Sequence, residues 1–133
     1  MSNNADETIL FKETLNHVAN REQITLLRSS VASWNIWRES NPHIEPEFDR
    51  VDFNDINLSN ANLRKANFHM ALLNGANFQG ANLTKTYFAG SDLRGANLSE
   101  TNCQGVKFND ADLGGCTFRK SNLRNIDFSN RDL

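Results

Sequence analysis

The side chains in this sequence that could carry out chemistry are three histidines, His17, His43 and His69, and two cysteines, Cys103 and Cys116. Histidine can act as a general base or a metal ligand, and a cysteine thiolate as a nucleophile or a metal ligand. The histidines are far apart, and none has a partner at metal-ligand spacing; nucleophile elbows, phosphate loops and zinc motifs are also missing. The sequence therefore predicts a protein that is not an enzyme and binds no cofactor or metal ion.

The composition predicts one domain with no strong electrostatic preference. The chain has 133 residues, a formal net charge of −2 and 23% charged residues, so we expect no direct binding to nucleic acid. Its first residues lack the basic start and apolar run of a secretory signal, and no apolar stretch approaches the roughly 18 to 20 residues of a membrane span. Two cysteines make no disulfide framework, which suits a reducing compartment. We expect a cytoplasmic protein that does not bind the membrane.

The elements that must position any site follow from a large apolar residue at every fifth position from Phe48 to Leu133. Each of these residues is Leu or Phe except Cys103, and the residue two positions earlier is mostly small. A step of five residues defines no face of a helix and alternates between the faces of a flat strand. The pattern instead predicts a short extended side followed by a corner, with the large and the small residue both pointing inward. Six glycines lie at the expected corners, where the backbone needs conformational freedom: Gly75, Gly80, Gly90, Gly95, Gly105 and Gly115.

Four equal sides would close into a square, so one coil should take twenty residues. Phenylalanine occupies every position of one series at this interval, which supports a coil of this length and not a triangular coil of fifteen. The predicted core ladder comprises Phe48, Phe68, Phe88, Phe108 and Phe128. We predict a mainly β fold, a four-sided solenoid of about four coils.

The units ANLRK, ANFQG, ANLTK, SDLRG and ADLGG resemble the A(D/N)LXX pattern of the pentapeptide repeat family, and the resemblance covers residues 46–133. It implies a right-handed quadrilateral β-helix. The preceding segment, with its WNIWR sequence, resembles the leader found before the repeats in many cyanobacterial members. A few members of the family mimic B-form DNA and act on type II topoisomerases, whereas most have no known activity. The resemblance thus implies a fold and leaves the function open.

Residues 1–45 are predicted to form an N-terminal helical cap and connector, and residues 46–133 the repeat domain. An apolar stripe predicts one helix over residues 21–40, ended by Asn41 and Pro42, with a shorter helix over residues 6–18. The residues of the stripe are Ile24, Leu27, Val31 and Trp34. Because the end of a solenoid exposes unpaired strand edges, we expect Trp34 and Trp37 to pack the helix onto the open first coil.

Charged residues separate onto opposite sides of the predicted square. One side has only basic residues: Arg64, Lys65, Lys85 and Arg124. The opposite side has a predicted acidic face of Asp52, Asp55, Asp92, Asp112 and Asp132, together with Arg94 and Arg131. Stacked carboxylates about 4.8 Å apart repel one another, so the face could mimic DNA phosphates or bind a cation. Alternatively it is an ordinary solvated face, since Asp is common at this position of the repeat and Leu72 interrupts the column.

The clearest departure from the repeat is the stretch HMALLNG, residues 69–75. Leu72 occupies an outward position where Asn or Asp is expected, Met70 lies across the corner, and Tyr87 replaces Asn on the neighbouring side one coil higher. Outward apolar residues indicate a contact surface, so Met70, Leu72 and Tyr87 form a predicted partner patch. The alternatives are that the N-terminal helices cover these residues, or that the variation is incidental.

Two hypotheses for function follow. In the first, the protein is a non-enzymatic protein-interaction module, a rigid solenoid scaffold that acts as an adaptor or regulator of a protein partner whose identity the sequence does not reveal. In the alternative, it is a DNA-mimic regulator of a type II topoisomerase that acts through the acidic face. The repeats run to Leu133 without a cap. At that end we expect a homodimer, another protein, or the continuation of a longer chain.

Overall fold

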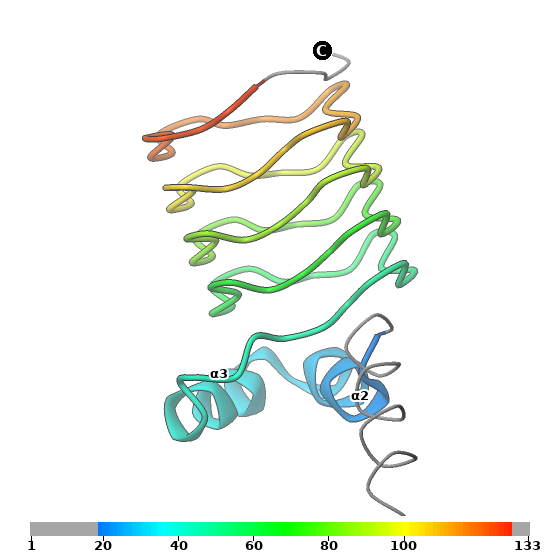
Figure 1. Cartoon of the computed structure of the whole chain (residues 1–133), viewed down its shortest axis with the longest axis vertical. Coiled ribbons are helices and arrows are strands. Elements are labelled where there is room, and N and C mark those ends of the chain that lie inside the picture. Colours follow the sequence, from blue (N-terminus) through cyan, green and yellow to red (C-terminus); the bar gives the residue numbers. More distant parts are fainter. Residues whose placement is uncertain (1–18, 129–133) are drawn as a thin grey trace, which may run out of the picture.

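The computed structural model describes residues 19–128 and consists of two short helices below a tower of stacked coils (Figure 1). Helix α2 spans Arg21–Ser29 and helix α3 spans Val31–Ser40. The coils begin near Glu47, the first residue bridged to the next coil. The boundary predicted between residues 45 and 46 lies just before this point and stays a prediction. The helix expected over residues 6–18 lies outside the described residues.

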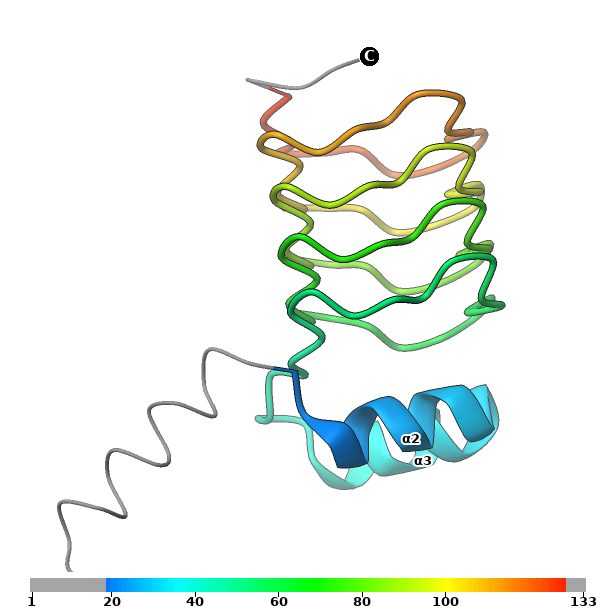
Figure 2. The same cartoon turned by 90° about the vertical axis from the view of Figure 1, so that its right-hand side faces the viewer.

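The prediction of a single helix over residues 21–40 is wrong, because the helix is interrupted at Ser30. This residue has an extended backbone (φ −168°, ψ 125°), and its side-chain oxygen accepts a hydrogen bond of 3.1 Å from the backbone N–H of Ser33. A serine that caps the next helix in this way offers the chain an alternative to helix continuation. The break lets α2 and α3 lie side by side (Figure 1), and both run across the end of the tower (Figure 2).

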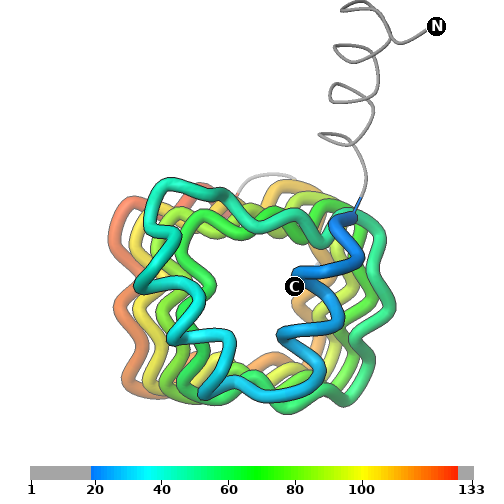
Figure 3. Tube along the Cα trace, turned by 90° about the horizontal axis from the view of Figure 1, so that it is seen from below, coloured from blue at the N-terminus to red at the C-terminus, as the bar shows by residue number. Residues whose placement is uncertain are grey.

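The coils stack in a register of twenty residues. The residue before each large apolar residue forms a parallel β-bridge with its equivalent twenty positions away, as in the pairs Asp52–Leu72 and Leu72–Asp92. Backbone hydrogen bonds join successive coils; the N–H of Phe53, for example, donates to the carbonyl oxygen of Leu72 at 2.8 Å. Each side contributes one bridged residue between corners, and the coils have a four-sided outline when viewed along the axis (Figure 3).

The corners require a left-handed backbone conformation at the second residue after each large one. Glycine supplies it at several corners, for example at Gly75 and Gly95 with φ of 68° and 70°. Other corners hold side chains in the same conformation, including Met70 with φ 54° and Lys85 with φ 58°. A side chain at such a corner projects from the edge between two sides of the tower.

The core is a column of large side chains along the axis. Neighbouring rings of the phenylalanine ladder are nearly parallel, with centroid separations of 5.0 Å for Phe48–Phe68, 5.2 Å for Phe68–Phe88, 5.6 Å for Phe88–Phe108 and 6.0 Å for Phe108–Phe128. The first four rings are fully buried, whereas Phe128 is 36% exposed. Stacked rings of this kind stabilise the tower beyond the burial of their area.

Polar side chains of α3 bind the open edge of the first coil. The indole N–H of Trp34 donates to the carbonyl oxygen of Asn62 at 2.8 Å. The side chain of Asn35 accepts from the Asn62 N–H at 2.8 Å and donates to the Asn60 carbonyl at 3.0 Å. Arg38 donates to the Arg64 carbonyl at 2.9 Å. The WNIWR segment therefore replaces the backbone groups of a missing coil.

Candidate functional site

Three large apolar side chains are exposed around one corner of the tower. Met70 is 46% exposed, Leu72 43% and Tyr87 38%. Leu72 lies in one column between Asp52 and Asp92, and Tyr87 lies in the column of the adjacent side. Met70 forms the corner between these two sides. We call Met70, Leu72 and Tyr87 the apolar patch.

His69 extends this patch. The sequence analysis placed His69 in the HMALLNG stretch but did not include it in the predicted patch. Its ring stacks on that of Tyr87 with a centroid distance of 6.1 Å and an interplanar angle of 28°. Its Nδ1 lies 2.7 Å from a carboxylate oxygen of Asp49, which fixes the ring orientation. The register of twenty places residues 69 and 87 on the same side of successive coils, but the ring contact also depends on side-chain conformations that the register does not specify. His69 thus packs against Tyr87 and directly precedes Met70 in the chain.

The patch interrupts a hydrogen-bond pattern that explains why the repeats are rich in asparagine. At the outward position before the large residue, Asn or Asp accepts a hydrogen bond from the backbone N–H two residues later. Examples are Asn82 to the N–H of Thr84 at 3.1 Å and Asn97 to the N–H of Ser99 at 2.9 Å. Leu72 has no side-chain oxygen, and Tyr87 lacks the short side-chain amide or carboxylate that makes this bond. Because Leu72 cannot accept the hydrogen bond from the backbone N–H of Asn74, that N–H donates to the side-chain oxygen of Asn54 at 2.9 Å.

A hollow of about 440 Å³ adjoins the patch at Tyr87. Its lining residues come from the connector and the first three coils: Glu45, Glu47, Lys65, Asn67, Lys85 and Tyr87. The amide nitrogen of Asn67 donates to a carboxylate oxygen of Glu47 at 3.0 Å. We call this hollow the lysine groove. Sequence reasoning did not find it, because the path of the connector cannot be read from the repeat.

The predicted acidic face is only partly assembled. Asp52, Asp92 and Asp112 share one column, with Leu72 between the first two. Arg94 lies beside this column, 2.7 Å from a carboxylate oxygen of Asp92 and 3.8 Å from one of Asp112. The hydrogen bond from Arg94 holds the pKa of Asp92 below its usual value. The opposing charge of Arg94 therefore reduces the negative potential of this column.

Two other aspartates of the predicted face do not extend this column. Asp55 lies at a corner with φ 59°, below Gly75. Asp132 lies outside the described residues. Among residues 19–128, no group of three or more His, Cys, Asp or Glu side chains is arranged to hold a metal ion.

The two cysteines point into the tower. Cys103 is fully buried with its sulfur 3.0 Å from the hydroxyl of Thr101, and the thiol of half-buried Cys116 donates to the Leu93 carbonyl at 2.9 Å. Burial raises the pKa of each thiol to about 11. Both therefore stay protonated near neutral pH, which makes them poor nucleophiles and metal ligands.

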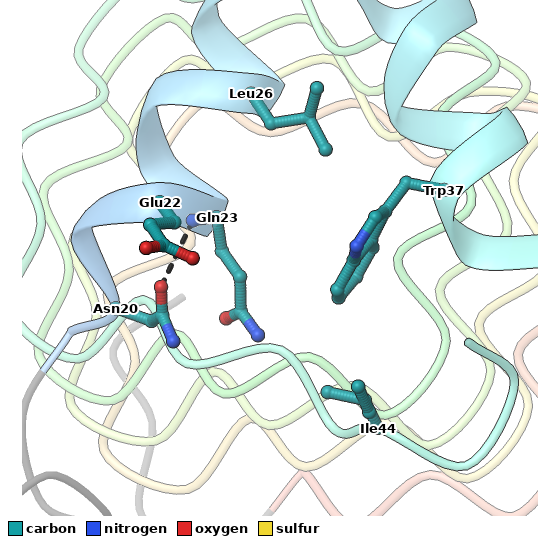
Figure 4. A pocket seen from close by; sticks show the side chains of 6 residues that line it. All are labelled: Asn20, Glu22, Gln23, Leu26, Trp37 and Ile44. Carbon is teal, nitrogen blue, oxygen red and sulfur yellow. Dashed lines mark hydrogen bonds between the residues drawn. The ribbon is translucent and has the colours of Figure 1, made fainter. Parts of the chain in front are cut away.

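A second hollow, of about 430 Å³, lies between α2, α3 and the connector (Figure 4). Leu26, Trp37 and Ile44 form its apolar wall, and Asn20, Glu22 and Gln23 its polar edge. The side chain of Asn20 caps α2 by accepting from the N–H of Gln23 at 3.0 Å.

Neither helix of the described chain is long and apolar enough to cross a membrane.

Comparison with protein families matches the model of pentapeptide repeats to residues 47–80, 76–115 and 96–133, in 8 copies. The chain belongs to the pentapeptide repeat family. Membership implies a right-handed β-helix solenoid, which agrees with the stacked coils. Comparison with curated proteins found no match.

Two similar solved structures are also pentapeptide repeat proteins. One, from the thylakoid lumen of Arabidopsis thaliana, is 33% identical over 65% of this chain, with a TM-score of 0.53. The match spans 64% of that protein, less than two thirds of its length. The other, Rfr23 from the cyanobacterium Cyanothece 51142, is 19% identical over 74% of this chain and 92% of its own, with a TM-score of 0.56, and shows likeness of fold alone.

A more distant match is QnrB1, a plasmid-mediated fluoroquinolone resistance protein. It is 19% identical over 70% of this chain and 67% of its own, with a TM-score of 0.29. At this level of similarity the match does not bear on the function of the present chain.

Proposed function

We propose that this protein is a non-enzymatic protein-interaction module, an adaptor or regulator that binds a protein partner through the apolar patch. The observation that carries the proposal is the loss of the local hydrogen bond at Leu72 and Tyr87, where this tower exposes apolar side chains in place of the usual Asn or Asp. Tyr and Met side chains are enriched at protein interfaces, and Tyr is among the residues that most often supply a large share of the binding energy.

The rigidity of the tower supports this proposal. Hydrogen bonds between coils and the ladder of stacked rings hold the backbone beneath the patch in one conformation. A surface that is already ordered loses less conformational entropy when a partner binds.

The N-terminal helices of the described chain do not cover the patch. Their polar side chains bind the open edge of the first coil, at Asn60, Asn62 and Arg64. Met70, Leu72 and Tyr87 are exposed with both helices in place. This arrangement favours a separate partner over intramolecular cover by α2 and α3.

Regulation of a topoisomerase by DNA mimicry has less support. A mimic needs a continuous run of negative charge, and here Leu72 separates Asp52 from Asp92 while Arg94 pairs with Asp92. The cytoplasmic location expected from the sequence is also a proposal, since the similar Arabidopsis protein comes from the thylakoid lumen.

A pull-down from native lysate tests the patch with variants that restore the repeat. Leu72→Asn and Tyr87→Asn together replace the apolar side chains by the residue that fills equivalent positions at Asn77 and Asn97. Asparagine at these positions can accept the local backbone hydrogen bond, so the double variant should fold. Ile36→Gln is the matched control, because it removes a 66% exposed apolar side chain from α3.

We expect a protein that is recovered by wild type and by Ile36→Gln and lost from the double variant. Recovery of every bound protein by the double variant would contradict binding through the patch. A DNA mimic binds through many charged contacts, so its binding should weaken much more steeply as salt rises than binding that rests mainly on the apolar patch.

A further inference from the structure

We propose that the partner presents a linear segment in which an Asp or Glu side chain lies next to an aromatic or aliphatic one. The carboxylate is held by Lys65 and Lys85 in the lysine groove, and the apolar side chain packs on Tyr87. This inference rests on the proposed function and specifies the chemistry of the partner.

The two lysines are positioned to act together. They occupy equivalent corners of successive coils, with φ of 60° and 58°, and both line the groove. Successive coils are spaced by about 4.8 Å, so the two ammonium groups are anchored within reach of one anion. Salt bridges among the described residues include neither lysine. An anion between them would reduce their mutual repulsion.

The groove and the patch form one continuous surface. Tyr87 belongs to both, since it lines the groove and stacks on His69 beside Met70. A carboxylate bound at Lys85 therefore places the neighbouring residue of a linear segment over the Tyr87 ring. The groove thus selects the charge and the patch selects the apolar residue.

The remaining groups of the groove favour a single carboxylate over a phosphate. Glu45 and Glu47 line the end toward the connector, and Glu47 accepts from Asn67. Their negative charges repel a dianion more strongly than a monoanion. The groove also lacks arginine, the side chain whose planar fork suits phosphate recognition. A carboxylate at the lysine end fits this distribution of charge.

Selection of random short peptides displayed on phage, against the immobilised full chain, tests the inference. We expect selected peptides to be enriched in Asp or Glu within a few positions of an aromatic or aliphatic residue. The Lys65→Glu and Lys85→Glu double variant should weaken binding of these peptides at least about tenfold, because opposite charges become like charges. A new selection against that variant should enrich Lys or Arg instead.

A matched control separates the effect of the groove lysines on binding from the effects of net charge and of misfolding. Lys120 occupies the same position in its five-residue unit, with φ 62°, but lies at a different corner of the tower and lines a different surface. Lys120→Glu should leave peptide binding unchanged. Glutamate is compatible with this backbone conformation, since Glu100 already adopts it with φ 58°. The variants should therefore fold, which circular dichroism and thermal unfolding will check.

Other outcomes overturn the inference in distinguishable ways. Peptides that require Leu72 and Tyr87 but show no acidic preference would contradict the role of the lysines and leave the patch as the binding site. Peptides that bind the Leu72→Asn, Tyr87→Asn variant equally well would contradict both the inference and the patch as a peptide site. Tighter binding of peptides with phosphoserine in place of the Asp or Glu would contradict the preference of the groove for a carboxylate. Failure to select any peptide would contradict a linear segment, and the pull-down would then decide the proposed function independently.

Discussion

The indole N–H of Trp34 donates a hydrogen bond of 2.8 Å to the carbonyl oxygen of Asn62. Trp34 belongs to helix α3 and Asn62 to the first coil, whose lower edge has no preceding coil to supply a donor. The Trp34 ring is fully buried and lies 5.6 Å from that of Phe48, the first ring of the ladder. One side chain thus closes both the polar edge and the apolar core of the solenoid.

Trp34→Phe should keep the aromatic packing and lose the hydrogen bond. Because the Asn62 carbonyl would be left without its donor, we expect the free energy of unfolding to fall by about 1–3 kcal/mol. Urea denaturation followed by circular dichroism measures this change. Trp37→Phe is the control, since Trp37 is half-buried and has no such bond to the first coil among the described residues. Equal losses in the two variants would contradict a capping role for the Trp34 hydrogen bond.

Asparagine at the outward position should stabilise the coil through its local hydrogen bond. The Asn82 side chain accepts from the backbone N–H and the hydroxyl of Thr84, at 3.1 and 2.7 Å. We expect Asn82→Leu to lower the free energy of unfolding by about 0.5–1.5 kcal/mol. Leu72→Asn should be neutral or stabilising by thermal unfolding. A large loss of stability in Leu72→Asn would instead assign Leu72 a structural role and weaken the case for a partner.

The phenylalanine ladder should lose most stability where a ring is enclosed on both sides. Phe88 lies 5.2 Å from Phe68 and 5.6 Å from Phe108, and it is fully buried. We expect Phe88→Ala to cost about 3–5 kcal/mol, because it opens a cavity in the core. Phe128→Ala should cost less, since that ring is 36% exposed. Guanidinium denaturation of both variants compares them, and a similar cost at the two positions would contradict a ladder that is most tightly packed at its centre.

The buried thiol of Cys103 should make the fold sensitive to alkaline pH. Its pKa is raised by burial to about 11 in the folded protein, from the ordinary value of 9.0. Between these values the unfolded thiol ionises while the folded one does not, so stability is retained below pH 9 and falls as pH rises toward 11. By linkage the loss is on the order of 2–3 kcal/mol.

Cys103→Ala tests this prediction through the pH dependence of the urea midpoint. The variant should show a smaller decrease between pH 9 and 11 than the wild type, although both retain Cys116, whose pKa is also raised to about 11. A decrease of the same size in both proteins would show that ionisation of Cys103 does not drive the loss.

The regular part of the molecule could be predicted from the sequence because each five-residue unit makes the same local step. A residue such as Phe68 therefore has its neighbours Phe48 and Phe88 determined by position alone, and the bridges follow the same interval. The exposed positions of Leu72 and Tyr87 could be recognised for the same reason, since an exception is visible against a repeat.

The tertiary structure decided the features that do not repeat. The break at Ser30 depends on a local hydrogen bond that competes with an apolar stripe running through it. The pairing of Arg94 with Asp92 and the stacking of His69 on Tyr87 depend on side-chain conformations, which residue spacing does not specify. The lysine groove is completed by Glu45, which the connector brings beside the first coils. A repeat determines which backbone positions are neighbours, whereas packing of the non-repeating segments and side chains determines which of them form a site.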